Sequence, residues 1–257
     1  MEPDREPDKE PDRELDEEQD KEQETGKRRA RTARHGGFMK NLGTILGIWA
    51  HPDDEAYLSG GLMALATEAG ERVVCVTATR GELSADPGQR TAELHACLKI
   101  LGVTEHHWFD YRDGECSRVP PSAAIARLQK IIARVRPDTI VSFGPDGNTG
   151  HPDHQAVARW AEAATPPGTR LLQTAVPDDW ATRWKTVNER FQVFQPGYPV
   201  TSPESELAVH LTLEPPVLDR KVRALTAQAT QTAGLIAAMG ADFASWVADE
   251  AFVESGG

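Results

Sequence analysis

From residue 42 onward, short apolar runs alternate with longer amphipathic segments. The apolar runs are rich in β-branched residues and are typical of buried strands, whereas the longer segments carry apolar residues at helical spacing. Strands are predicted over residues 44–49, 72–79, 106–110, 139–143 and 171–176. Helices are predicted between them, over residues 55–69, 90–101, 122–136 and 153–164.

This alternation predicts an α/β fold, a doubly wound, mostly parallel Rossmann-like sheet with helices on both faces. The pattern weakens after residue 176. Residues 177–205, rich in Trp and Pro, indicate an irregular insertion. An extra strand is predicted over residues 206–213, a long helix over 216–239 and a shorter helix over 243–253.

The first 26 residues have a different character, because they repeat a four-residue Glu-Pro-Asp-Arg/Lys unit. Prolines at this spacing block a helix, and the repeat has almost no apolar side chains to bury. We therefore predict a disordered acidic tail over residues 1–38 and a single domain over residues 39–257.

The charge of the chain argues against a polyanionic partner. The formal net charge is −12, and residues 1–26 alone contribute −9. The predicted domain is itself mildly acidic and has no basic face, so nucleic-acid binding is not expected. No apolar run approaches the roughly 20 residues of a membrane span, and the acidic start does not resemble a signal peptide. A cytoplasmic protein is the expectation; the sequence leaves a homo-oligomer open.

Two motifs carry the chemistry of the chain. Ala50-His-Pro-Asp-Asp-Glu55 directly follows the strand at 44–49, and Gly150-His-Pro-Asp-His154 follows the strand at 139–143. In a doubly wound sheet of order 3-2-1-4-5, these two strands are neighbours at the switch point where ligands bind. With that strand order as an assumption, both motifs border one crevice.

Three residues of the motifs form a candidate metal site: His51, Asp54 and His154. Catalytic zinc sites use about three histidine or carboxylate ligands and leave one position for water. Zinc is therefore the expected cofactor, one ion per chain, although Fe²⁺ or another divalent ion also suits this ligand set.

Two further motif residues suit catalysis. Asp53 can accept a proton from metal-activated water, and protonated His151 can stabilise an oxyanion and later protonate a leaving amine. Asp153 or Asp146 are candidates to orient a histidine. The alternative for either motif alone is a helix cap, but two such motifs after the first and fourth strands favour the metal site.

The paired motifs and the βα units between them, residues 42–164, resemble the LmbE-like, PIG-L family of zinc-dependent de-N-acetylases. The resemblance implies His51, Asp54 and His154 as metal ligands, Asp53 as general base and His151 as electrostatic or acid partner. It also implies that Arg80 borders the substrate pocket, although a surface arginine in a loop is an equal alternative. Residues 56–58, Ala-Tyr-Leu, depart from the serines and lysine of mycothiol-conjugate amidases.

The leading hypothesis is a metal-dependent hydrolase that removes an N-acyl group, acetyl by expectation, from an N-acetylglucosamine-type sugar or its conjugate. The alternative is a non-catalytic, metal-containing member that binds a sugar or glycolipid. A nucleotide-binding oxidoreductase is disfavoured, because His-Pro-Asp-Asp-Glu stands where a glycine-rich phosphate loop would be needed. Trp180, Trp184, Phe191 and Tyr198 suit either packing or stacking on the substrate.

Overall fold

A computed structural model of the chain describes residues 42–255, and the predicted disordered tail lies outside them. In these residues a seven-stranded sheet has the order β3-β2-β1-β4-β5-β9-β8. Its strands are β1 (Ile45–Trp49), β2 (Val73–Thr79), β3 (Glu105–Tyr111), β4 (Thr139–Phe143), β5 (Arg170–Thr174), β8 (Val209–Thr212) and β9 (Asp249–Glu254). The first five are parallel, which confirms the predicted strand order.

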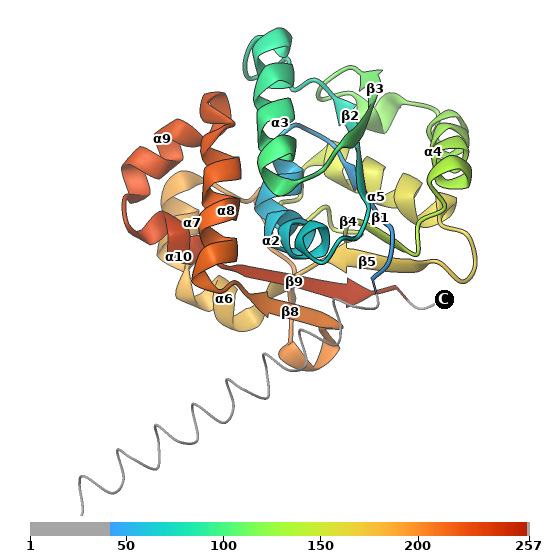
Figure 1. The fold of residues 1–257 in the computed structure, drawn as a ribbon. Helices are drawn as coiled ribbons and strands as arrows, with labels where there is room; N and C mark the ends of the chain where they lie inside the picture. The colour runs from blue at the N-terminus through green and yellow to red at the C-terminus, as the bar shows by residue number, and fades with distance from the viewer. Residues whose placement is uncertain (1–41, 256–257) are drawn as a thin grey trace, which may run out of the picture. The chain divides into compact units, whose positions relative to one another are not determined.

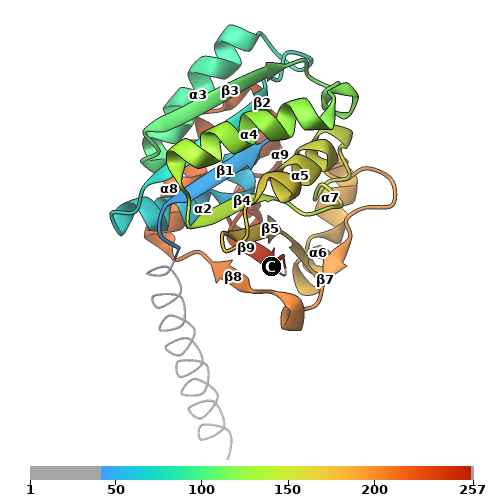
Figure 2. The same ribbon diagram turned by 90° about the vertical axis from the view of Figure 1, so that its right-hand side faces the viewer.

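Helices cover both faces of the sheet (Figures 1 and 2). On one face lie α2 (Asp54–Glu68), α3 (Pro87–Leu101) and α8 (Pro215–Thr226). On the other lie α4 (Pro121–Val135) and α5 (Pro152–Ala164). Every residue of β1, β2 and β4 is buried, because side chains on both faces of these strands pack against helices. The predicted fold class is confirmed.

The segment after β5 departs from the prediction. The region expected to be irregular holds two short helices, α6 (Asp178–Arg183) and α7 (Lys185–Phe191). It also contributes β7 (Thr201–Ser202), which pairs with β6 (Val176–Pro177). Short helices of this kind lack the periodic signal that longer ones provide.

The long helix expected over residues 216–239 is interrupted. It consists of α8 and α9 (Ala229–Met239), with a break at Gln228. The buried Gln228 side chain donates a 2.6 Å hydrogen bond to Glu55 in α2, so a tertiary contact accompanies the break.

The prediction of a helix over residues 243–253 is wrong. Only a short helix, α10 (Asp242–Trp246), forms at its start. The chain then continues into β9, which pairs antiparallel with both β5 and β8. A run of this length is compatible with either a helix or a strand. It forms a strand here because β5 and β8 offer backbone groups with which it can pair. Within residues 42–255, no helix has the length and apolar character needed to cross a bilayer.

Glu250 of β9 fixes this C-terminal arrangement. Its carboxylate accepts hydrogen bonds from the backbone amides of Gly61 and Leu62 in α2, at 2.6 and 2.8 Å. Lys221 of α8 lies 2.7 Å from it, and both side chains are fully buried. A single buried group therefore ties β9, α2 and α8 together.

We expect the substitution Lys221→Met to lower the free energy of unfolding by about 3–5 kcal/mol, because it leaves the Glu250 carboxylate buried without its cation. The matched control is Arg223→Met in the same helix, whose exposed pair with Asp219 at 3.9 Å contributes within about 0.5 kcal/mol. Urea unfolding followed by circular dichroism measures both. Equal losses in the two variants would contradict the assigned role of Lys221.

Candidate active site and metal centre

The candidate site lies where the loops after β1 and β4 meet. These strands are parallel neighbours, with Ile45 opposite Thr139 and Gly47 opposite Val141. Their carboxyl ends therefore open onto the same edge of the sheet. The first loop leads into α2 and the second into α5, so each motif sits at a helix N-terminus.

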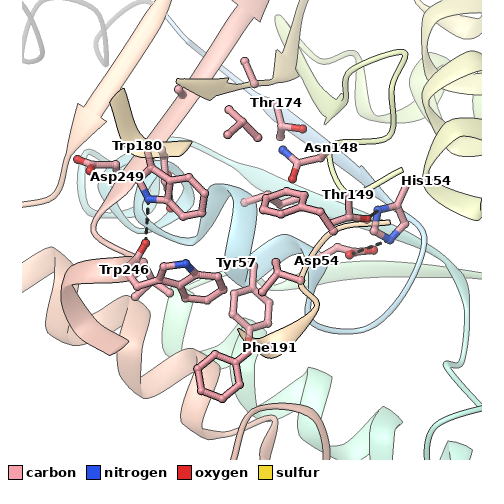
Figure 3. Close-up of a pocket in the computed structure, with 18 of the residues that line it drawn as sticks. Asp54, Tyr57, Asn148, Thr149, His154, Thr174, Trp180, Phe191, Trp246 and Asp249 are labelled. Atoms are coloured by element: carbon pink, nitrogen blue, oxygen red, sulfur yellow. Dashed lines mark hydrogen bonds and ion pairs between the residues drawn. The ribbon is translucent and has the colours of Figure 1, made fainter. Parts of the chain in front are cut away.

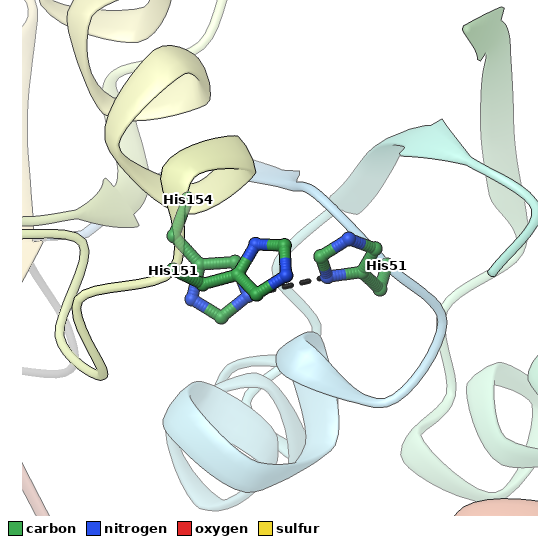
Figure 4. A group of neighbouring side chains, drawn as sticks. All are labelled: His51, His151 and His154. Carbon is green, nitrogen blue, oxygen red and sulfur yellow. Dashed lines mark hydrogen bonds between the residues drawn. The ribbon is translucent and has the colours of Figure 1, made fainter. Parts of the chain in front are cut away.

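The imidazole rings of His51 and His154 face one another across this junction, with His151 beside them (Figure 4). His51 Nδ1 lies 3.2 Å from His154 Nε2. The carboxylate of Asp54 lies 3.3 Å from His154 Nε2 and 3.7 Å from His51 Nδ1. His51 is half-buried, whereas Asp54 and His154 are buried. The structure thus brings the three predicted ligands together.

The second nitrogen of each imidazole ring is held by an acceptor. His154 Nδ1 donates to the carbonyl oxygen of Gly147, at 3.0 Å. His51 Nε2 lies 3.1 Å from a carboxylate oxygen of Asp113 and 3.3 Å from one of Asp153. With those nitrogens protonated, the nitrogens that face Asp54 are free to bind a metal ion, an arrangement common around metal-bound histidines. The donor set therefore fits a divalent ion.

The carboxylates around His51 favour a cation. Burial by itself would lower the pKa of His51, but hydrogen bonds to Asp113 and Asp153, with Asp54 nearby, raise it to about 10. Burial would raise the pKa of Asp113, but the His51 interaction outweighs it and lowers the pKa to about 2. Burial lowers the pKa of His154 to about 4, so this ring is neutral and its Nε2 lone pair is available to a metal ion.

Asp53 stands beside this cluster in an unusual backbone conformation, with φ at 114°. Its backbone amide donates a 3.1 Å hydrogen bond to the buried Glu55 carboxylate. Burial and the neighbouring Asp54 raise the pKa of Asp53, and the guanidinium of Arg90, 3.6 Å from its carboxylate, opposes that rise. Arg90 is itself buried and bonds the carbonyl oxygen of Pro52. Asp53 is thereby fixed next to the ligands.

His151 lies against both candidate ligand histidines, with ring centroids 4.9 Å from His51 and 5.0 Å from His154. Its Nδ1 accepts a hydrogen bond from the backbone amide of Asp153, at 3.2 Å. The neutral ring therefore carries its proton on Nε2. Burial and the charge of His51 lower the pKa of His151, which favours that neutral form.

The comparisons with known proteins agree on one family. Residues 46–165 match the model of the family "PIG-L: GlcNAc-PI de-N-acetylase". A 1D-myo-inositol 2-acetamido-2-deoxy-alpha-D-glucopyranoside deacetylase of Acidothermus cellulolyticus is 30% identical over 234 residues, which cover 74% of this chain and 80% of that protein. The chain belongs to the PIG-L family.

Two further comparisons show how much of the chain is similar to known proteins. A deacetylase of the same name from Kineococcus radiotolerans is 32% identical over 206 residues, 64% of this chain. The match spans only 55% of that protein. The N,N'-diacetylchitobiose deacetylase of Pyrococcus horikoshii has a similar fold, with a TM-score of 0.58 at 20% identity, over 84% of this chain and 85% of that one. The predicted PIG-L, de-N-acetylase family is confirmed.

Not every candidate side chain of this PIG-L protein joins the cluster. The guanidinium of Arg80 lies 4.0 Å from the ring centroid of Trp108 and bonds Asp110 at 2.7 Å and Thr91 at 2.8 Å. Its role in substrate binding stays a prediction. Burial raises the pKa of Asp146, and its predicted part in orienting a histidine stays a prediction.

The sequence left open which histidine Asp153 orients. In the structure its carboxylate faces Nε2 of His51, at 3.3 Å. Its carboxylate also accepts hydrogen bonds from the backbone amides of Gly114 and Cys116, at 2.8 and 2.9 Å. Sequence reasoning missed Asp113 and Arg90. Asp113 follows β3 at the same sheet edge, a position that could have marked it; Arg90 carries no comparable signal, because it looks like an ordinary helix residue.

A cavity of about 660 Å³ adjoins the cluster (Figure 3). Asp54 and His154 lie at one end of it, next to Asn148 and Thr149. The buried Asn148 has a φ of 61°, and its side chain forms no hydrogen bond with the residues that the structure describes. The other end is lined by side chains from α6, α7, α9 and α10.

We expect Asp113→Asn to weaken zinc binding about 10–100-fold, because it removes a carboxylate that holds His51 Nε2. Asp110→Asn is the matched control, since it removes the same charge three residues earlier from an exposed carboxylate that pairs with Arg80. Competition with a chromophoric chelator measures both affinities. If Asp113→Asn binds zinc as tightly as the control does, Asp113 does not support the site.

Proposed function

We propose that this protein is a metal-dependent de-N-acetylase that hydrolyses the acetamido group of an N-acetylglucosamine-type conjugate. The observation that carries the proposal is the convergence of His51 Nδ1, His154 Nε2 and the Asp54 carboxylate, with Asp53 beside them. Family membership supports the reaction class, and the names of the curated relatives support an amino sugar as substrate.

His51, Asp54 and His154 would hold the ion, and zinc is the ion that this donor set favours. A bound divalent ion supplies a Lewis acid for the amide carbonyl and lowers the pKa of water. The remaining parts of the reaction belong to side chains of this chain.

Asp53 takes the proton of the attacking water as general base. Its position is fixed by the Glu55 hydrogen bond to its backbone and by Arg90 beside its carboxylate. The proton gained by Asp53 is then available to the nitrogen of the leaving amine, so one carboxyl group serves as base and acid.

His151 donates a hydrogen bond from Nε2 to the oxyanion. The Asp153 amide that bonds Nδ1 keeps the ring in the tautomer with its proton on Nε2. This neutral ring differs from the protonated His151 that the sequence suggested. A donor fixed before the reaction stabilises developing charge without reorganising.

We expect removal of metal with a chelator to abolish acetate release from N-acetylglucosamine conjugates, and added zinc to restore it. The physical reason is that a bound divalent ion both polarises the amide carbonyl and activates the attacking water. Acetate is measured by a coupled enzymatic assay on stripped and reloaded protein. Full activity in stripped protein would exclude a metal-dependent reaction.

We expect Asp53→Asn to reduce kcat about 10²–10⁴-fold while zinc binding is retained, because the amide cannot accept the proton. Asn tolerates positive φ, so the backbone at this position can stay as it is. Asp86→Asn is the control, since it changes the charge of a residue that caps α3, where Asn caps equally well. An Asp53→Asn enzyme with full kcat would remove Asp53 from the mechanism.

A further inference from the structure

The cavity beside the metal cluster has two chemically different ends (Figure 3). At the end with Asp54 and His154, the polar side chains of Asn148 and Thr149 lie close by. Tyr57 lies between the two ends (Figure 3). Beyond it, the lining is mainly apolar, although Gln192 and Gln231 also border the cavity; the large apolar side chains are Trp180, Phe191, Phe194, Leu235 and Trp246. The reacting amide belongs at the polar end, so the far end receives a substituent of the substrate.

The indole N–H groups at the far end are already bonded within the protein. Trp180 Nε1 donates to the carbonyl oxygen of Trp246, at 3.1 Å. Trp246 Nε1 donates to Asn188 Oδ1, at 3.0 Å. The two rings, with centroids 6.0 Å apart, therefore offer the cavity apolar surface and no donor.

The carboxylates that border the cavity are also paired. Asp249 lies 3.3 Å from Arg183 and accepts a 2.8 Å hydrogen bond from Thr212. Glu250 is bonded to Lys221 and to two amides of α2. A polyhydroxylated group at this end would exchange its hydrogen bonds to water for contacts with apolar walls, which is unfavourable.

The wall formed by α9 completes the apolar surface. This helix, residues 229–239, contains no charged residue, and Leu235 lines the cavity from it together with Gly234 and the polar Gln231, whose side-chain amide donates a hydrogen bond to Thr230. Phe191, at the end of α7, lines the cavity too. A pocket of this volume with mainly apolar walls is suited to a ligand group of similar character.

Resting on the proposed function, we propose that the substrate carries a sizeable apolar group, an alkyl chain or aromatic ring, which occupies the far end of this cavity. The polar inositol in the names of the curated relatives' substrates does not match these walls. The apolar group is attached either at the amide, as a longer acyl chain, or at the anomeric carbon of the sugar, as an aglycone.

Two substrate series distinguish these attachments. The first keeps the acetyl group and compares methyl, hexyl and decyl glycosides of N-acetylglucosamine with N-acetylglucosamine joined to inositol. The second keeps free glucosamine and compares N-acetyl, N-hexanoyl and N-decanoyl groups. Full burial of one methylene is worth about fourfold in affinity, so kcat/KM should rise at least about tenfold from short to long chain in one series.

Two variants connect such a preference to the cavity. Phe191→Ala and Leu235→Ser each remove apolar surface from the far end, so we expect each to reduce the advantage of the long chain about tenfold. Each variant should lose more activity on the decyl substrate than on the methyl glycoside, because only the longer chain reaches the far end. The matched control is Val200→Ala, which removes an apolar side chain that is 56% exposed and does not line the cavity; it should change neither rate.

Failure of this proposal differs from failure of the proposed function. Acetate release with no gain from chain length in either series, or with inositol as the preferred substituent, would overturn the apolar site and leave the de-N-acetylase intact. No acid release from any substrate would overturn the proposed function. Calorimetric binding of the decyl glycoside and of N-decanoylglucosamine to Asp53→Asn then tests the cavity by itself. Binding of both compounds no tighter than that of their short-chain counterparts would overturn the apolar site.

Discussion

The parallel pairing of β1 with β4 is the constraint on which the site depends. The candidate ligands His51 and His154 are 103 positions apart in the chain, and only this pairing brings their ring nitrogens to 3.2 Å. The pairing is stable because both strands are buried on both faces, and Trp49 and Phe143 pack edge to face at their ends. The same pairing sets α2 and α5 side by side at their N-termini, where each motif begins. A change in strand order would therefore abolish the site without altering any of its residues.

The electrostatics of the site follow from this concentration of acidic groups. Asp54, Asp113 and Asp153 surround one imidazole ring, and each carboxylate has a defined partner or backbone donor. His51 stabilises the charged form of two of these carboxylates, because the pKa values of Asp113 and Asp153 are both lowered in spite of burial. Asp54 faces the ring nitrogens of His51 and His154, so a divalent cation bound there would add positive charge where the carboxylates concentrate negative charge.

The C-terminal third of the chain forms most of the cavity beside the candidate metal cluster. β9 enters the sheet between β5 and β8, and its Glu250 anchors α2 and α8. The helices α6, α7, α9 and α10 then enclose a cavity that opens beside Asp54 and His154. The family model matches residues 46–165, which hold the candidate metal cluster. Most of the cavity wall lies beyond them, so the proposed reaction chemistry and the proposed substrate selection belong to different parts of the sequence.

The sequence by itself determined the elements from β1 to β5, because apolar periodicity is a local property that each segment expresses independently. It also determined His51, Asp53, Asp54, His151 and His154 as the candidate cluster, since two motifs at equivalent positions of the fold are a strong signal. Only the tertiary structure decided that Asp113 and Arg90 join that cluster, because neither stands in a motif. It likewise decided that residues 249–254 form a strand. A short apolar run is compatible with a helix or a strand, and the choice depends on whether neighbouring strands offer unpaired backbone groups.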